Sequence, residues 1–182
     1  HKGEKVKQVA DYTIARHFPE VAELENPYIG LITEVRNRQA ALIAQWVLIG
    51  FVHGVMNTDN MALSGETIDF GPCAMMDEFH PQCVFSAIDR DARYAWGNQA
   101  SIAHWNLSRL AEALLPLIDR DSEQAQELAK QSLEKFSSIF VSHYHRNYCR
   151  KFGVPLETSP EFIRESLTLL ANWCQIKKVP IK

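Results

Sequence analysis

The sequence predicts a mainly α protein that carries one small β-hairpin. Apolar residues recur at helical spacing along most of the 182 residues. Residues 40–49 are apolar nearly all round, which is typical of a buried central helix. Two short extended runs, residues 61–63 and 67–70, flank Ser64-Gly65-Glu66, in which Gly65 is the expected turn residue.

Local start and stop signals define the helices. Asn26 is an expected N-cap with Pro27 at the first helical position, and Asp121 and Ser159 are expected N-caps of later helices. Gly153 is a stop signal. Helices are expected over residues 4–17, 28–51, 97–117, 121–148 and 159–175. Residues 50–60 and 73–95 are expected to be irregular, and Trp46, Trp105 and Trp173 are expected to pack in the interior.

Composition indicates one globular domain over residues 1–182. Hydrophobic residues make up 46% and charged residues 23% of the chain, and the net charge of -3 argues against nucleic acid or an anionic membrane as the main partner. The longest apolar run, residues 44–52, is too short to span a bilayer. The cysteines are scattered without a C-x-x-C pair, which predicts reduced thiols and a cytoplasmic location. They are Cys73, Cys83, Cys149 and Cys174.

A polar loop at residues 53–60 precedes the tripeptide Asp69-Phe70-Gly71. Asn60 and Asp69 supply the hard oxygen ligands that Mg²⁺ prefers, and Asp59 can orient an incoming hydroxyl or accept its proton. The order of helix, polar loop, hairpin and metal-binding Asp is that of the large lobe of a protein kinase. Asp and Asn are also ordinary turn residues, so the alternative is a structural loop.

Other polar residues have weaker claims to function. His53 is a possible base or ligand, but packing against the hairpin is favoured. His143 and His145 are two residues apart on a helix and do not share a face, which argues against a metal pair. Arg93 is expected to pair with a loop carboxylate rather than a phosphate. Cys73 is expected to be a small packing residue rather than a nucleophile.

At these residues the sequence resembles the selenoprotein O family of kinase-like protein adenylyltransferases. The resemblance rests on two segments, His-Gly-Val-Met-Asn-Thr-Asp-Asn at residues 53–60 and Thr-Ile-Asp-Phe-Gly-Pro-Cys-Ala at residues 67–74. Arg93-Tyr94, Asn98-Gln99 and Trp105-Asn106-Leu107 follow in the order of the family. The resemblance covers at least residues 8–118.

The resemblance implies a fold, an activity and a set of site residues. The family binds ATP in an orientation flipped relative to kinases and transfers AMP to Ser, Thr or Tyr hydroxyls of proteins. ATP and protein hydroxyls are therefore the expected partners, and Mg²⁺ is the expected cofactor, with Mn²⁺ as the alternative. Asp59 matches the base, Asn60 and Asp69 match the metal ligands, and Asp69 also lies against the nucleotide phosphates.

The chain also departs from the family pattern. Ala92 stands where Gly is usual, which puts the local loop geometry in doubt. No Gly-rich loop or strand-borne Lys of the small N-terminal lobe is present, and the chain starts at His1 without a Met. These features predict a fragment of the large lobe that is inactive alone. Apolar surface left by the missing lobe would favour self-association.

Two alternatives to AMP transfer stay open at this stage. Phosphoryl transfer of the protein-kinase type needs the same metal ligands and the same oriented hydroxyl. A catalytically inactive kinase-like interaction module is the other, although it gives no chemical reason to keep Asp59, Asn60 and Asp69 together.

Overall fold

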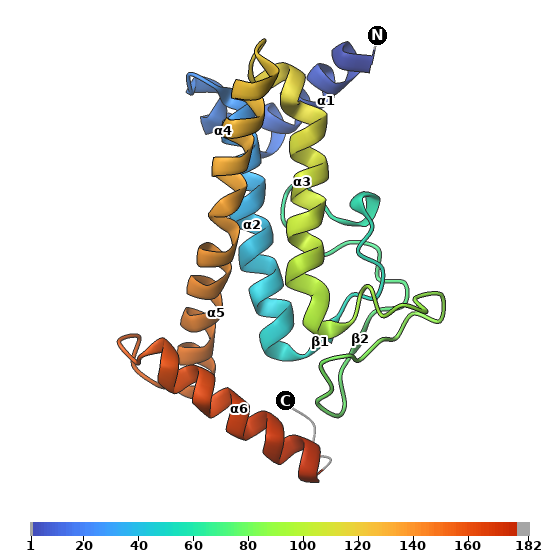
Figure 1. Cartoon of the computed structure of the whole chain (residues 1–182), viewed down its shortest axis with the longest axis vertical. Coiled ribbons are helices and arrows are strands. Elements are labelled where there is room, and N and C mark those ends of the chain that lie inside the picture. The colour runs from blue at the N-terminus through green and yellow to red at the C-terminus, as the bar shows by residue number, and fades with distance from the viewer. Residues whose placement is uncertain (1, 178–182) are drawn as a thin grey trace.

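A computed structural model describes residues 2–177 of the chain (Figure 1). The described residues are mainly helical and include a small antiparallel sheet. The helices are α1 (Lys2–His17), α2 (Pro27–Ile49), α3 (Gln99–Ile118), α4 (Ser122–Glu134), α5 (Phe136–Phe152) and α6 (Pro160–Lys177), and the strands are β1 (Phe51–Val52) and β2 (Ala74–Met75). Short 3-10 turns lie at Pro19–Glu23, Thr58–Asn60 and Trp96–Asn98.

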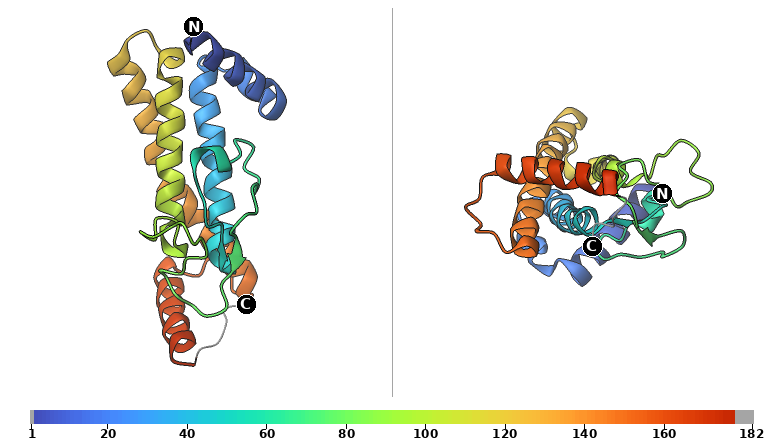
Figure 2. Two further views of the ribbon diagram at one scale, coloured as in Figure 1. Left: turned by 90° about the vertical axis from the view of Figure 1, so that its right-hand side faces the viewer. Right: turned by 90° about the horizontal axis from the view of Figure 1, so that it is seen from below.

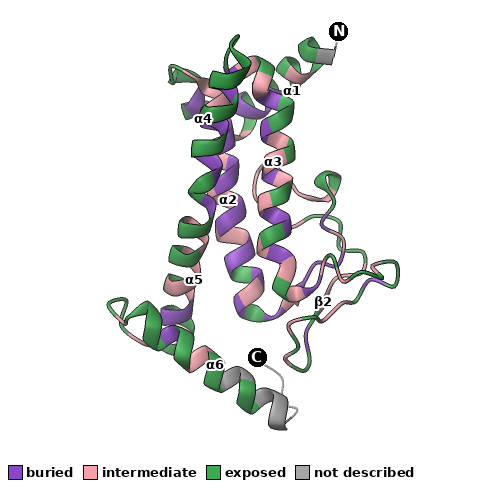
Figure 3. Cartoon of the chain, viewed as in Figure 1, coloured by how far each residue is buried: buried purple, intermediate pink, exposed green. Residues whose placement is uncertain are grey.

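Helix α2 is the centre of the fold, as its apolar sequence predicts. It packs against α3, α4 and α5, and buried positions follow one another along its length (Figure 3). Asn26 caps it as predicted, because its Oδ1 accepts a hydrogen bond from the Ile29 N–H at 3.1 Å. The helix ends at Ile49 rather than residue 51, since the Gly50 N–H turns back to the carbonyls of Trp46 and Val47.

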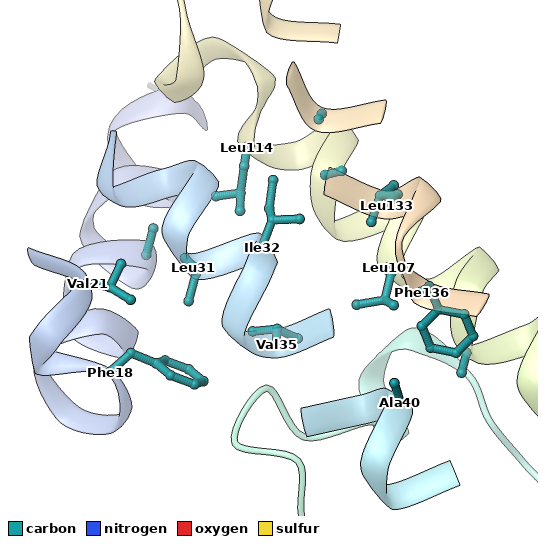
Figure 4. Packing of buried hydrophobic residues seen from close by; sticks show 14 of the residues in the cluster. Phe18, Val21, Leu31, Ile32, Val35, Ala40, Leu107, Leu114, Leu133 and Phe136 are labelled. Atoms are coloured by element: carbon teal, nitrogen blue, oxygen red, sulfur yellow. The ribbon is translucent and has the colours of Figure 1, made fainter. Parts of the chain in front are cut away.

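One continuous core joins helices α1 to α5, and part of it is drawn in Figure 4. Leu31, Ile32 and Val35 of α2 are at most 2% exposed and meet side chains from the neighbouring helices. Those side chains include Phe18, Val21, Leu107, Leu114, Leu133 and Phe136. A second, smaller cluster of Leu48, Tyr148, Cys149 and Ile163 holds α6 against the ends of α2 and α5.

The predicted helix over residues 121–148 is wrong in one respect, because the structure divides it. Asp121 caps α4 as predicted, accepting hydrogen bonds from the Glu123 and Gln124 N–H groups. Lys135 then takes φ -75° and ψ -10° and pairs its N–H with the Leu133 carbonyl, which interrupts the regular ladder of hydrogen bonds. Helix α5 starts directly afterwards and runs on to Phe152, so α4 and α5 follow one another along a similar line in Figure 1.

The prediction for the tryptophans is correct for one and wrong for two. Trp46 is buried, at 5% exposure, and its ring stacks on His53 and packs at a tilt against Phe51. Trp105 is 40% exposed and Trp173 is 51% exposed. The position of Trp105 on α3 points its indole toward two arginines instead of the core: the guanidinium groups of Arg93 and Arg109 lie 4.7 Å and 5.2 Å from its ring centre.

The predicted hairpin is reduced to a turn with a single bridge. Gly65 provides the turn, with φ +82° and its N–H bonded to the Ala62 carbonyl at 3.0 Å. Only Met61 and Thr67 pair across it, and the two-stranded sheet forms instead between β1 and β2. Residues 67–70 do not continue as a strand, because a histidine side chain binds the Ile68 carbonyl and Asp69 turns to φ +54°.

The segment between α2 and α3 lies on one side of the helices (Figure 2). It is largely irregular apart from β1, β2 and the short turns, as expected.

Cys73, Cys83 and Cys149 are free thiols, as predicted, and His1 lies outside the described residues. None of the described helices combines the length and the hydropathy that crossing a membrane requires.

Replacing Gly65 with alanine should destabilise the protein more than the same change at Gly153. Both glycines have left-handed backbones, with φ +82° and +66°, so both substitutions cost about 1 kcal/mol. A Cβ at residue 65 would also lie 2.5 Å from Cβ of Arg38, whereas nothing lies within 4 Å of a Cβ at residue 153. Urea unfolding should show a loss at least about 1 kcal/mol larger for Gly65→Ala. Equal losses would contradict the close approach of the turn to α2.

Candidate active site

The loop after β1 is held in place by the side chain of Gln99, at the start of α3. Its Nε2 donates to the Phe51 carbonyl at 2.9 Å, and its Oε1 accepts from the His53 N–H at 3.0 Å. Gln99 is fully buried. One carboxamide therefore satisfies two backbone groups on either side of Val52 and fixes the chain where it enters the loop.

His53 connects this loop to the segment that carries Asp69. It is fully buried, its ring stacks on Trp46 with centres 5.3 Å apart, and its Nε2 lies 2.8 Å from the Ile68 carbonyl oxygen. A carbonyl can only accept, so Nε2 carries the proton, while Nδ1 accepts from the Val55 N–H. Both ring nitrogens are thus occupied, which confirms the packing interpretation of His53 over a catalytic one.

Helix α2 binds the turn between the two segments. Gln39 Nε2 donates to the Ala62 carbonyl at 2.7 Å, Arg38 donates to the Ser64 carbonyl at 3.1 Å, and Trp46 Nε1 donates to Thr67 Oγ1 at 3.1 Å. Three side chains of one rigid helix therefore hold backbone and side-chain groups along the whole turn. These bonds to α2 hold the turn in position, although only Met61 and Thr67 pair across it.

Gly54 allows the two sequence motifs to touch. Its φ is +87°, and a Cβ there would lie 3.0 Å from Pro72 Cγ and 3.1 Å from the Pro72 carbonyl oxygen. Only glycine fits both the backbone angle and the space. The polar loop therefore packs closely against Pro72, the residue directly after Asp69-Phe70-Gly71.

Asp59 and Asn60 lie in the 3-10 turn Thr58–Asn60. Asp59 is exposed, and Asn60 is half-buried with its Nδ2 donating to the Val55 carbonyl at 3.2 Å. This bond assigns the nitrogen of the amide to the loop and leaves Oδ1 as the free acceptor. From α3, Asn106 Nδ2 holds the Met56 carbonyl at 3.0 Å, so the loop is anchored on both sides of Gly54.

Asp69 stands at a strained point of the chain. Its φ is +54°, which is rare for a residue with a side chain, and its carbonyl accepts from the Gly71 N–H at 2.8 Å. Its side chain is exposed. The residue before it is tied to His53, so the conformation of Asp69 is imposed by its surroundings. Such backbone strain concentrates at functional sites.

The oxygen atoms of Asn60 and Asp69 suit Mg²⁺. One amide oxygen and one carboxylate are hard donors, and a protein commonly gives Mg²⁺ only one or two such ligands while phosphates and water complete the octahedron. Among the described residues, no ion pair involves Asp59 or Asp69, which leaves both carboxylates free. No group of three or more His, Cys, Asp or Glu side chains suited to a metal occurs within residues that the structure describes. His145, on α5, binds the Thr158 carbonyl through its Nε2 at 2.7 Å.

The prediction that Arg93 pairs with a loop carboxylate is wrong. Its guanidinium lies over Trp105, while the Asp89 carboxylate accepts from the backbone N–H groups of Arg93 and Tyr94 at 2.8 Å each. The loop carboxylate is therefore used to shape the backbone. Tyr94 reaches the polar loop, where its hydroxyl donates to Asn57 Oδ1 at 2.5 Å.

The Cys83 thiol near this region is not an activated nucleophile. Burial raises the pKa of the Cys83 thiol above its ordinary value, so the thiol stays protonated at neutral pH. Cys73 is half-buried next to β2.

A family model described as "Protein adenylyltransferase SelO" matches residues 1–178. The match covers nearly the whole chain, including both loop segments. The chain belongs to the SelO family. The resemblance to selenoprotein O that the loop motifs indicate is confirmed.

Relatives in the SelO family carry the name protein nucleotidyltransferase YdiU. The chain is 49% identical to the one from Shewanella denitrificans over 176 residues, which is 94% of this chain and 35% of the relative. It is 54% identical to the one from Alkaliphilus metalliredigens over 151 residues, 83% of this chain and 31% of the relative. It is 51% identical to the one from Bacillus cytotoxicus over 172 residues. The chain thus spans about a third of the length of these relatives.

Sequence reasoning missed the residues that position the loops. Gln99 and Asn106 were visible only as parts of a family motif, and Gln39 and Arg38 gave no signal as polar residues of a long helix. Their partners lie 23 to 50 positions away in sequence. The available signal for Gln39 was its place among apolar residues on the buried face of α2.

Replacing Gln99 with glutamate should destabilise the protein and loosen the loop. A carboxylate can still accept a hydrogen bond from the His53 N–H, but it has no hydrogen to donate to the Phe51 carbonyl. Its negative charge would also be buried at this position, which is unfavourable. The expected loss of unfolding free energy is about 2–3 kcal/mol, with faster hydrogen exchange at the His53 amide. Gln126→Glu, an exposed position on α4, should change stability by less than about 0.5 kcal/mol. Similar effects at both positions would show that Gln99 does not anchor the loop.

Proposed function

We propose that the intact protein is a Mg²⁺-dependent protein adenylyltransferase that transfers AMP from ATP to Ser, Thr or Tyr hydroxyls of proteins. The observation that carries this proposal is the SelO match over residues 1–178 in a chain that keeps Asp59, Asn60 and Asp69. The relatives named as protein nucleotidyltransferases favour nucleotidyl over phosphoryl transfer.

Asp59 is proposed to act on the acceptor hydroxyl. Its carboxylate is exposed and free of ion pairs among the described residues, so it can orient the hydroxyl and take its proton. The hydroxyl oxygen forms a bond to the α-phosphorus, and the bond from that phosphorus to the departing pyrophosphate breaks. The hydroxyl proton goes to Asp59.

Asn60 and Asp69 are proposed to hold the metal, with Asp69 also next to the nucleotide phosphates. A bound Mg²⁺ would neutralise the charge on the phosphate oxygens. Asn60 contributes Oδ1, which its bond to the Val55 carbonyl leaves available. Asp69 contributes a carboxylate whose backbone is fixed between the His53 tether at Ile68 and the turn at Gly71.

The kinase-like interpretation of the fold is part of the same proposal. A long central helix, a polar loop, a turn and an Asp-Phe-Gly segment follow one another in the described structure, and α3 anchors the loop from behind. We propose that these helices form the large lobe of a kinase-like fold. Because the sequence has no Gly-rich loop, the 182 residues alone should not transfer AMP.

Asp69→Ala in the intact protein should reduce AMP transfer by a factor of about a hundred or more, because the metal loses its charged ligand. Transfer is measured with ATP labelled at the α-phosphate, and Asp91→Ala, at an exposed residue of the same irregular segment, is the matched control. The 182-residue chain assayed alongside should show no transfer.

Each outcome of this assay has a separate meaning. Wild-type turnover by Asp69→Ala would contradict the metal assignment. In a parallel assay with ATP labelled at the γ-phosphate, label on protein without any α-label would show phosphoryl transfer, as in a protein kinase, and would overturn AMP transfer while leaving the metal site intact. Full activity of the 182 residues would overturn the proposed need for a second lobe.

A further inference from the structure

The polar loop is also bound from the irregular segment that precedes α3. The Tyr94 hydroxyl donates to Asn57 Oδ1 at 2.5 Å, across 37 positions of the sequence. Asn57 is the residue before the 3-10 turn Thr58–Asn60, and its carbonyl accepts from the Asn60 N–H at 3.0 Å. Its side chain makes no capping bond to that turn, so its amide is available to Tyr94. The phenol hydroxyl therefore holds the residue on which the turn begins.

Tyr94 is a firm support for this bond because its own backbone is fixed. The Asp89 carboxylate accepts from the N–H groups of Arg93 and Tyr94, with one oxygen for each, at 2.8 Å. Asn98, directly before α3, binds the Ala92 carbonyl through its Nδ2 at 2.8 Å. The Tyr94 ring also packs against the main core. The Tyr94 hydroxyl thus has a defined position relative to α3.

Asp59 depends on this support more than its neighbour Asn60 does. Asn60 is also tied to the Val55 carbonyl through its own Nδ2, at 3.2 Å. The Asp59 carboxylate forms no ion pair among the described residues, so it has no charged partner to orient it and takes its direction from the backbone of the turn. A group that accepts a proton must lie within about 3 Å of the hydroxyl that gives it, so a small displacement of the turn matters.

We infer that Tyr94 is a positioning residue for Asp59: its hydrogen bond to Asn57 holds the turn where the Asp59 carboxylate meets the acceptor hydroxyl. The inference rests on the proposed role of Asp59 in AMP transfer. Tyr94 itself keeps its proton throughout. The proton of the acceptor hydroxyl still goes to Asp59, and pyrophosphate still leaves the α-phosphorus.

Tyr94→Phe in the intact protein removes the hydroxyl and keeps the ring in its place. The variant should lower kcat for transfer of the α-phosphate label about fivefold. It should leave KM for ATP within about twofold of the wild type, because the Asn60 side chain keeps its bond to Val55. A raised KM for ATP at unchanged kcat would overturn the assignment to Asp59.

A second variant tests whether the effect passes through this one bond. Asn57→Ala removes the acceptor, so it should lower kcat by a similar factor, and the double variant with Tyr94→Phe should be no slower than either single variant. Multiplication of the two losses, to about 25-fold in the double variant, would overturn the inference. Tyr28→Phe is the matched control and should keep the wild-type kcat. Tyr28, at the start of α2, also packs against the main core and donates its hydroxyl to a side-chain oxygen, Asp11 Oδ1, at 3.0 Å.

Hydrogen exchange at the Asn60 amide tests the same bond without turnover, because that N–H is bonded to the Asn57 carbonyl. Exchange should be about threefold faster or more in Tyr94→Phe and unchanged in Tyr28→Phe. Unchanged exchange in Tyr94→Phe would overturn the inference, whether or not the protein transfers AMP. Absence of α-label transfer by the wild type would overturn the proposed function instead, and the exchange rates would still decide whether Tyr94 holds the turn.

Discussion

The geometry of the candidate site depends on the buried carboxamide of Gln99. It bonds the Phe51 carbonyl and the His53 N–H at once, and so fixes the chain between the end of α2 and the polar loop. His53 in turn binds the Ile68 carbonyl, which places the residue before Asp69. The Gln99 anchor on α3 therefore links both segments that carry the predicted site residues, and bonds from Asn106 and from α2 hold them at further points. The anchor works because α2 and α3 are packed rigidly through the common core.

The parts of the fold that the sequence predicts correctly are encoded by neighbouring residues. Asn26, Asp121 and Ser159 are N-caps in the structure, because a cap needs only the backbone N–H groups two or three positions ahead. The predicted hairpin was wrong in its extent for the opposite reason. The expected second strand, residues 67–70, is bound at the Ile68 carbonyl by His53, which lies 15 positions earlier in the sequence. The residues around Ile68 give no local signal for such a bond.

The same distinction applies to the site. Asp59, Asn60 and Asp69 could be selected from the order of motifs along the chain, and their roles stay predictions. The anchoring roles of Gln39, Gln99 and Asn106 could not, since the local sequence of a glutamine or asparagine in a helix does not show which distant backbone group its side chain binds. The exposed position of Trp105 was missed because helical spacing does not reveal that two arginines cover its ring.

Two residues with side chains, Asp69 and Ala92, have left-handed backbones, at φ +54° and +53°. Ala92 keeps this glycine-like conformation despite its Cβ. Bonds from Asn98 Nδ2 and the Ala95 N–H to the Ala92 carbonyl hold it there. The irregular segment is thus fixed by hydrogen bonds rather than by regular structure, which is how loops carry strained functional residues.

The central claim is that the two anchored segments place Asn60 and Asp69 at one metal ion. Paramagnetic Mn²⁺ tests it directly when added, with a non-hydrolysable ATP analogue, to the intact isotope-labelled protein. The account predicts that the side-chain amide of Asn60 and the backbone amide of Asp69 broaden together at the lowest Mn²⁺ concentrations. Broadening of one without the other, or of neither, would contradict a shared site.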